Sequence, residues 1–313
     1  MKNTSHKSVL LFGATGLIGS ELGKQLVQQG VHVHAALRQP EDEIRLAFKP
    51  AAIHVIDFHQ PASLQQAMKD VDYVLYFAAF SIPAQSPLDP VNEFTHTLPA
   101  LRHTLEAMKG KRPHFIFPSS GGAIYGEIKG AANETSPLHA TSSYALGKIL
   151  SEQLIHFYSA NHQIPFTILR FANVYGSTQK RLLPQGIIDR FLDNTLQGKS
   201  SPIWGDVNIT RDFLHASDAA KAVIAVLNNA DNGLNQTFNI ASGQSHSIKD
   251  VLDIIHEVTD GKHTYENMQE NFAGIKSCQL SNDKFRKAYP AWECKLDLRE
   301  GIKQTWNGKI IPH

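Results

Sequence analysis

A tyrosine and a lysine lie four residues apart in the segment Tyr144-Ala-Leu-Gly-Lys148, and two serines, Ser119 and Ser120, end an earlier apolar stretch. A spacing of four residues puts a phenol and an ammonium on one face of a helix. A phenol is a poor base at neutral pH because its usual pKa is about 10, and a neighbouring ammonium favours the phenolate. A serine hydroxyl beside it could bond a substrate oxygen and share the proton. These residue types therefore predict proton transfer at a substrate oxygen.

A glycine-rich turn, Gly13-Ala-Thr-Gly16-Leu-Ile-Gly19, follows the apolar run Val9–Phe12 and precedes a helical pattern that starts near Leu17. Glycine permits a tight turn, a close approach of a pyrophosphate to the backbone, and close packing of the helix on the strand. The first N–H groups of the helix would face the phosphates. The segment therefore predicts a dinucleotide site with these contacts: Gly13, Thr15, Gly16, Leu17, Ile18 and Gly19.

The end of the second predicted strand reads Ala35-Ala36-Leu37-Arg38 and lacks the carboxylate that would bind an adenosine ribose hydroxyl. An arginine can pair with a 2′-phosphate instead, so Arg38 favours NADP, with NAD as the alternative. After the third strand, Asp57 could accept a hydrogen bond from the adenine amino group, and Phe58 could stack beside the base.

Short apolar runs alternate with helical patterns through about the first 170 residues. Runs without polar alternation are typical of parallel strands that helices cover on both faces. The sequence therefore predicts an α/β fold, a doubly wound parallel sheet of the Rossmann type, with its site at the carboxyl ends of the strands. The predicted helices cover residues 17–29, 62–69, 91–109, 143–160, 185–196, 248–258 and 299–306.

After Arg170 the alternation loosens, which predicts a smaller C-terminal substrate-binding region. The dinucleotide-binding domain would comprise residues 1–173 and about 207–242. The substrate-binding region would comprise about 174–206 and 243–313. A cleft between two such parts is where a ligand is expected.

Composition excludes several classes of function. The chain has 313 residues with 30 Lys and Arg against 29 Asp and Glu, so no overall charge favours nucleic acid or an acidic membrane. The apolar run Val9–Phe12 is too short for a signal sequence or a membrane span, so a cytoplasmic protein is expected. The two cysteines form no CxxC pattern and no HxxxH occurs near a carboxylate, so no metal site is expected.

The chain resembles the extended short-chain dehydrogenases/reductases, specifically the NAD-dependent epimerase/dehydratase group that acts on nucleotide sugars. The resemblance covers nearly the whole chain and rests on an ordered series of motifs. They are GATGLIG, Asp57, FAAF, SSGGAIYGE, YALGK, LRFANVYG, IWGDVNITRDFLHASDAA, FNIASG and LREGIKQT.

The resemblance implies roles for the residues that carry the chemistry. Tyr144 would be the catalytic base and acid, and Lys148 would hold the nicotinamide ribose and lower the pKa of the tyrosine. Ser120 would be the catalytic hydroxyl. Because the usual Ser/Thr position of the family reads Gly121 here, Ser119 stays open as the alternative.

The resemblance also implies binding residues. Ala78 and Ala79 would contact the cofactor, and Asn173 and Arg211 would bind the phosphates of a nucleotide sugar. His96 lies near a position where these families often have an asparagine, so it would either join a proton relay or pack.

Nucleotide-sugar 4,6-dehydratases carry an Asp-Glu pair after the catalytic threonine, where this chain has Gly122-Ala123. That difference disfavours a dehydratase or a decarboxylase. The expected reaction is 4-epimerisation of a UDP-hexose, in which carbon 4 is transiently oxidised by hydride transfer with Tyr144 as base. The alternative is NADPH-dependent reduction of a 4-keto-6-deoxy nucleotide sugar, which Arg38 favours. A catalytically silent NAD(P)-binding regulator is less favoured because Ser120, Tyr144 and Lys148 are all retained.

Members of the family often form dimers through two helices of each subunit. The predicted helices 91–109 and 143–160 carry apolar residues that could build such a two-fold contact, so a homodimer is expected. These residues are Leu98, Leu101, Leu105, Leu150, Leu154 and Phe157.

Overall fold

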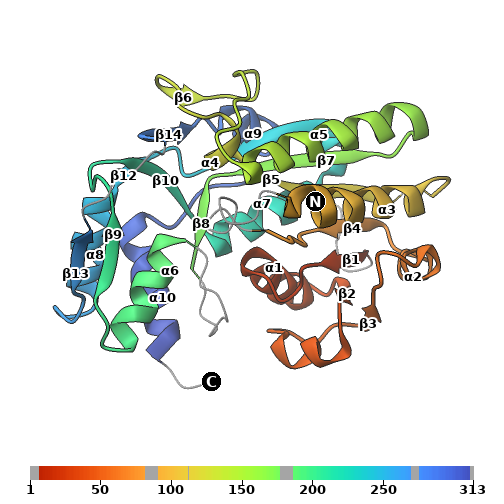
Figure 1. Ribbon diagram of the computed structural model, residues 1–313. Helices are drawn as coiled ribbons and strands as arrows, with labels where there is room; N and C mark the ends of the chain where they lie inside the picture. The colour runs from red at the N-terminus through yellow and green to blue at the C-terminus, as the bar shows by residue number, and fades with distance from the viewer. Residues whose placement is uncertain (1–6, 82–90, 112, 177–185, 269–274, 311–313) are drawn as a thin grey trace.

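A parallel sheet of seven strands dominates the computed structural model, which describes residues 7–81, 91–111, 113–176, 186–268 and 275–310. Its strand order is β3-β2-β1-β4-β5-β7-β11 (Figure 1). The strands are β1 (Ser8–Phe12), β2 (His32–Leu37), β3 (Ala52–Val55), β4 (Tyr73–Tyr76), β5 (His114–Ser120), β7 (Phe166–Phe171) and β11 (Gln236–Ile240). The predicted α/β, doubly wound fold is confirmed.

Successive side chains of β1 enter different cores. Val9 and Leu11 belong to one buried cluster, and Leu10 and Phe12 belong to the cluster on the opposite face. All four side chains are at most 2% exposed. Side chains alternate between the two faces of a strand, so a strand covered on both faces is apolar at every position. This explains the unbroken apolar runs in the sequence.

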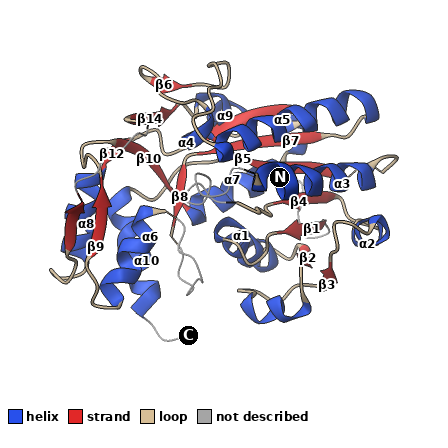
Figure 2. Cartoon of the chain, in the orientation of Figure 1, coloured by secondary structure: helices blue, strands red, loops and turns tan. Residues whose placement is uncertain are grey.

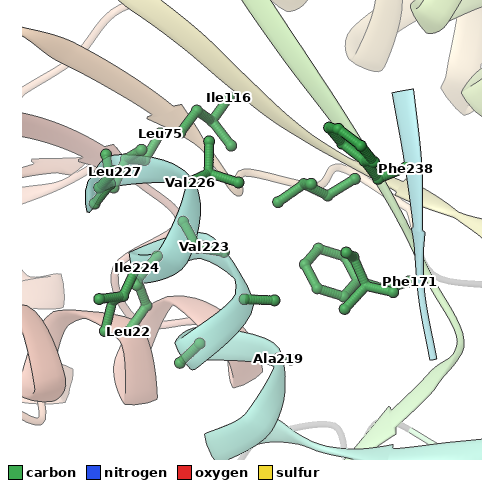
Figure 3. Packing of buried hydrophobic residues seen from close by; sticks show 14 of the residues in the cluster. Leu22, Leu75, Ile116, Phe171, Ala219, Val223, Ile224, Val226, Leu227 and Phe238 are labelled. Atoms are coloured by element: carbon green, nitrogen blue, oxygen red, sulfur yellow. The ribbon is translucent and has the colours of Figure 1, made fainter. Parts of the chain in front are cut away.

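Two groups of helices cover the sheet. Leu22 and Val223 of the first group lie in one cluster, and Leu101 and Ile155 of the second lie in the other. Figure 3 shows Val226 of the first group beside sheet residues of the same cluster. The first group is α1 (Leu17–Gln28) and α7 (Ala216–Asn228), and the second is α2 (Pro61–Ala67), α3 (Leu98–Met108) and α5 (Ser143–His162).

The chain changes direction across the sheet between β1 and β4. From β1 it proceeds to β2 and β3 on one side, and from β4 it proceeds to β5, β7 and β11 on the other. Connections leave a crevice at the carboxyl ends of the two strands that flank such a switch point. The fold thus positions a binding site where the sequence predicts one.

A smaller group of elements lies beside the large sheet. Helices α6, α8 and α10 pack around Phe191, Val251 and Ile302, and Figure 2 shows them gathered on one side of the molecule. A sheet in the order β12-β10-β14-β6 and a two-stranded sheet of β9 and β13 complete this part. The bounds are α6 (Ile187–Leu196), α8 (Ile248–Val258), α10 (Leu298–Ile310), β6 (Ala131–Ala132), β9 (Ser201–Trp204), β10 (Thr210–His215), β12 (Ser245–Ser247), β13 (Tyr265–Met268) and β14 (Ser277–Leu280).

Some C-terminal residues belong to the core of the large sheet. Phe285 of α9 (Asp283–Ala288) lies edge-on to Phe238 of β11, with ring centroids 5.4 Å apart. The ring of Trp292 lies edge-on to Phe285 at 5.1 Å. All three side chains are buried in the same cluster as α1 and α7. These C-terminal residues therefore complete the cover of the large sheet.

The predicted helix 91–109 differs in detail from the structure. It contains a π-helical turn, η2 (Glu93–Thr97), before α3 begins at Leu98. Pro99, in the first turn of α3, has no N–H to donate to the turn before it, and the π-helical turn lies at this place. Within the described ranges, no helix combines the length and the apolarity that a membrane crossing requires.

Candidate active site

A cavity of about 480 Å³ opens at the carboxyl ends of the large sheet. It is lined by Phe12 at the end of β1, Leu37 at the end of β2, and Phe171 at the end of β7. Most of the predicted site residues come together here. They are Gly13, Thr15, Gly16, Leu17, Ile18, Gly19, Arg38, Phe58, Ala78, Ala79, Ser120, Tyr144, Lys148 and Asn173.

The glycine turn has no room for side chains on its inner side. Gly13 has a φ of +75°, and a Cβ there would lie 2.3 Å from the carbonyl oxygen of Phe77. The N–H of Gly16 donates to the carbonyl of Gly13 at 2.8 Å and closes the turn. A Cβ on Gly16 would lie 2.9 Å from the same oxygen. Only glycine fits this left-handed, crowded position at residue 13.

Helix α1 begins directly at the turn and faces the cavity with its first residues, Leu17, Ile18 and Gly19. Its N-cap residue is Gly16, which makes no side-chain cap. The first N–H groups of a helix have no partner within the helix, and the helix dipole favours an anion there. A diphosphate close to a bare glycine backbone matches this arrangement, so these residues fit a dinucleotide.

The far end of the cavity is lined by Leu37, Arg38, Ile56 and Phe58. Arg38 is exposed there. A carboxylate that the sequence did not single out, Asp42, also lines this end, and it pairs with Arg45 at 2.9 Å.

Asp57, a predicted adenine contact, is not among the described residues that line the cavity. Its carboxylate accepts a hydrogen bond from the N–H of His59 at 2.8 Å. The aspartate therefore organises the turn after β3, while its neighbour Phe58 lines the cavity.

The start of α5 determines where the tyrosine lies. The hydroxyl of Ser142 caps the helix by accepting from the N–H of Ala145 at 3.2 Å. Tyr144 therefore lies in the first turn and Lys148 one turn later. The Lys148 ammonium is 5.8 Å from the centre of the Tyr144 ring and donates to the carbonyl of Pro118 at 2.9 Å. Both residues line the cavity.

The two serines at the end of β5 have different surroundings. The Ser120 side chain hydrogen bonds to Tyr144, and this bond favours the phenolate. The Ser119 hydroxyl is buried and has no hydrogen-bond partner in the described structure. Of the two hydroxyls that the sequence leaves open, that of Ser120 is the one that hydrogen bonds to the phenol.

Burial dominates the ionisation of the tyrosine and the lysine. It raises the pKa of Tyr144 to about 12; the bond to Ser120 acts in the opposite direction, and the charge of Glu93 adds to the rise. Burial lowers the pKa of Lys148 to about 8, while the charges of Glu93 and Glu152 raise it. In the protein alone the phenol is therefore protonated at neutral pH.

Asn173 and Arg211, the predicted phosphate contacts, differ in position. Asn173 lines the cavity, and its amide donates to the carbonyl of Asp212 at 3.0 Å. Arg211 is not among the described lining residues: its guanidinium donates to the carbonyls of Thr210, at 2.8 Å, and Ile275, at 2.7 Å. These two carbonyls hold the arginine within the smaller part. Nothing in the sequence indicates that the carbonyl of Ile275 lies beside Arg211.

Two residues at the site were not predicted from the sequence: Ser81, which lines the cavity, and Glu93, which hydrogen bonds to Ser81 from behind. Ser81 follows the FAAF motif at the carboxyl end of a predicted strand, which was a usable signal. No local signal marks Glu93. The ring of His96 is exposed and stacks on Phe80 at 6.4 Å, so it packs at the surface.

Comparison with known proteins decides the family. The model of the NAD dependent epimerase/dehydratase family matches residues 9–241. The chain belongs to this family. A relative from Methanocaldococcus jannaschii, named as a candidate UDP-glucose 4-epimerase, is 31% identical over 305 residues, covering 96% of this chain and 97% of the relative. The UDP-glucose 4-epimerase of Lacticaseibacillus casei is 28% identical and covers 96% of both chains.

Solved structures of family members agree with the fold. The UDP-glucose 4-epimerase of Thermotoga maritima, solved with UDP-glucose, has a TM-score of 0.85 and 25% identity over 96% of this chain and 98% of that one. The Thermus thermophilus UDP-glucose 4-epimerase, solved with NAD, gives the same TM-score, identity and coverage. The chain is accordingly an enzyme of the epimerase/dehydratase family.

Proposed function

We propose that the protein is an NAD(P)-dependent nucleotide-sugar 4-epimerase of the UDP-hexose type. The observation that carries the proposal is that the hydrogen-bonded Tyr144 and Ser120 line the same cavity as the glycine turn. The relatives named as UDP-glucose 4-epimerases and their complexes with UDP-glucose and NAD support this substrate class and cofactor.

NAD(P), when bound, supplies a group that accepts and returns a hydride. The residues of the glycine turn and the first N–H groups of α1 would bind its diphosphate. Lys148 would hold the ribose next to the ring, and Arg38 would meet a 2′-phosphate, which supports NADP over NAD. Asp42 lines the same end of the cavity, so the balance between the two charges would decide the preference.

Tyr144 would take the proton of the sugar 4-hydroxyl during oxidation and return a proton to the 4-keto oxygen during reduction. Because burial raises the pKa of this phenol to about 12, it needs a positive charge nearby to lose its proton at neutral pH. Ser120 would hold the substrate oxygen and the phenol in line. Asn173, which lines the cavity, would anchor the nucleotide while the 4-keto sugar rotates within the site. Arg211 is a weaker candidate for binding the phosphates because it lies outside the described lining and is bound by the carbonyl of Ile275.

The decisive experiment is incubation with UDP-glucose, UDP-galactose and their N-acetyl and uronic acid counterparts, with NAD or NADP added. Products are followed by NMR and the nicotinamide by absorbance. The proposal expects interconversion of 4-epimers without net change in the cofactor. Stoichiometric loss of NADPH with a 4-keto-6-deoxy nucleotide sugar would instead support the reductase.

Tyr144→Phe is the matched variant for the proposed base, with Tyr265→Phe, an exposed residue of β13, as control. We expect Tyr144→Phe to lower turnover by about 10²-fold or more with nearly unchanged nucleotide affinity. Full activity of that variant would contradict the assignment of the base.

A homodimer also belongs to this proposal. Leu146 and Phe157 of α5 are 38% and 60% exposed, and Phe94 of η2 is 47% exposed. Leu101 and Leu105, two of the residues expected at the contact, are instead buried in the core. Light scattering tests this contact. We expect the wild type to be a dimer and Phe157→Glu to be a monomer.

A further inference from the structure

A carboxylate that the proposed reaction does not use is buried directly behind the cavity. Glu93 is the first residue of η2 and is only 2% exposed. Burying a carboxylate costs free energy unless hydrogen bonds or opposite charges stabilise it. Its surroundings are therefore informative.

The carboxylate lies against α5 at Gly147. A Cβ on Gly147 would be 2.5 Å from Oε2 of Glu93 and 2.8 Å from its Cδ. Gly147 lies between Tyr144 and Lys148 in the chain and is itself buried. The absence of a side chain at residue 147 is thus what allows the carboxylate to approach the helix.

Two further contacts fix η2 to the cavity wall. The hydroxyl of Ser81, a buried residue that lines the cavity, donates to Oε1 of Glu93. The side-chain amide of Asn92 donates to the carbonyl of Phe80 at 2.6 Å. The segment after β4 and the turn η2 therefore hold the carboxylate in one place.

We propose that Glu93 is a positioning residue for the Tyr144–Lys148 pair, whose negative charge, seated on Gly147, keeps Lys148 an ammonium and sets the pH range in which the pair works. The part of this inference that concerns turnover rests on the proposed function. The part that concerns the charge of Lys148 does not.

The electrostatics agree with the geometry. Burial lowers the pKa of Lys148 to about 8, and Glu93 is the first of two carboxylates that raise it. The second, Glu152 on α5, is bound by Arg170 of β7 at 2.6 Å, so an adjacent cation offsets its charge. Glu93 also adds to the raised pKa of Tyr144.

Other titratable groups on elements that pack against η2 include His156 and His162 of α5, which are not among the influences on Tyr144 or Lys148, and three residues of α3. Arg102, His103 and Glu106 of that helix are not among the influences on Tyr144 or Lys148. Within the described structure, Glu93 is therefore the carboxylate shared by both members of the pair. A negative charge at this point opposes loss of a proton from either group.

The direct test is the ionisation of Lys148 in Glu93→Gln, which keeps the shape of the side chain and removes its charge. Trace acetylation of the purified protein at a series of pH values, with mass spectrometry of the peptide that contains residue 148, gives the midpoint of ionisation. We expect this midpoint to fall by about one pH unit, with or without NAD. Glu106→Gln, a carboxylate on the next helix, is the control and should leave it in place.

Two more variants separate charge from structure. Glu93→Asp keeps the charge and should keep the midpoint near that of the wild type. Ser81→Ala removes the hydroxyl and leaves the carboxylate, so it should also leave the midpoint close to the wild-type value. Equal midpoints in wild type and Glu93→Gln would overturn the proposal, as would an equal fall in Ser81→Ala.

Turnover gives an independent readout. With the nicotinamide cofactor bound, whose positive charge would favour the phenolate, the rising limb of the pH profile would follow loss of the Tyr144 proton, and the falling limb loss of the Lys148 proton. Because Glu93 opposes both losses, Glu93→Gln should move both limbs to lower pH together, whereas a purely structural role would lower the rate at every pH. If acetylation shifts but no UDP-sugar is converted by any form, the proposed function fails and the inference about the charge stands.

Discussion

The α-carbon of Gly19 in helix α1 faces the carbonyl of Gly13 so closely that a Cβ on Gly19 would lie 2.0 Å from that oxygen. The same carbonyl accepts the hydrogen bond that closes the turn at Gly16. One backbone oxygen thus requires two glycines at once: one to fold the turn and one to bring the helix against it. The cradle for the diphosphate depends on this contact.

Gly19→Ala should therefore displace the turn and the helix relative to each other. We expect a loss of stability of about 1–3 kcal/mol and a larger loss of nucleotide affinity. Thermal unfolding with and without NAD and NADP measures both. Gly130→Asn is the control because nothing lies within 4 Å of a Cβ there and asparagine tolerates its positive φ of +79°. Unchanged nucleotide affinity in Gly19→Ala would contradict the role of the cradle.

The two serines of β5 should differ in their effect on turnover. Ser120→Ala removes the hydroxyl that bonds to Tyr144, so we expect turnover to fall by about 10²-fold. Ser119→Ala removes a hydroxyl that has no partner in the described structure and should change turnover little. Epimerisation rates of the two variants, measured side by side, decide the matter; the reverse order would assign the catalytic role to Ser119.

Arg38 should influence the choice of nucleotide. Arg38→Asp would place a carboxylate where a 2′-phosphate would lie, so we expect the preference to move from NADP toward NAD by about 1–2 kcal/mol. Binding constants of both nucleotides by calorimetry measure the ratio. Lys303→Asp is the control, since Lys303 is exposed on α10 and is not among the described lining residues. A ratio unchanged in Arg38→Asp would mean that this arginine only faces solvent.

Acid should destabilise the protein partly through His114. Burial lowers the pKa of this histidine from 6.5 to about 4, and its Nε2 hydrogen bonds with the Thr167 hydroxyl at 2.8 Å. Between these two pH values the unfolded chain binds more protons than the folded one. The stability contributed by the neutral ring, up to about 3 kcal/mol, is therefore present above pH 6.5 and lost as the pH falls toward 4.

Urea unfolding at pH 7 and pH 5 tests this. The difference in unfolding free energy between the two pH values should be smaller in His114→Gln than in the wild type. His32→Gln, at an exposed position of β2, should keep the wild-type difference. Identical differences in all three proteins would argue against a role for His114.

Local patterns predicted most of the fold because the forces that set them are local. The predicted helix 248–258 is α8 with the same bounds, since Ser247 and Asp250 form a capping box at its start. The apolar runs predicted the parallel strands because both faces are buried. The division into two domains stays a prediction.

The positions of Arg211 and Glu93 depend on tertiary contacts, which local sequence patterns do not predict. Arg211 is bound by the carbonyl of Ile275, which comes from a segment more than sixty residues away. Glu93 gains its position from Ser81 and Gly147, which lie in two other segments. Such encounters leave no periodicity or motif at either residue. Residue spacing therefore predicts the glycine turn and the tyrosine but not the carboxylate behind them.

The edge-on cluster of Phe238, Phe285 and Trp292 has a consequence for biosynthesis. All strands of the large sheet have left the ribosome once β11 has emerged, yet the side chains that seal this end of its core come some fifty residues later. Until then the nascent chain carries an uncovered apolar edge beside β11. Exposed apolar surface on a partly folded chain favours aggregation, so residues 283–292 remove that hazard when they cover this edge.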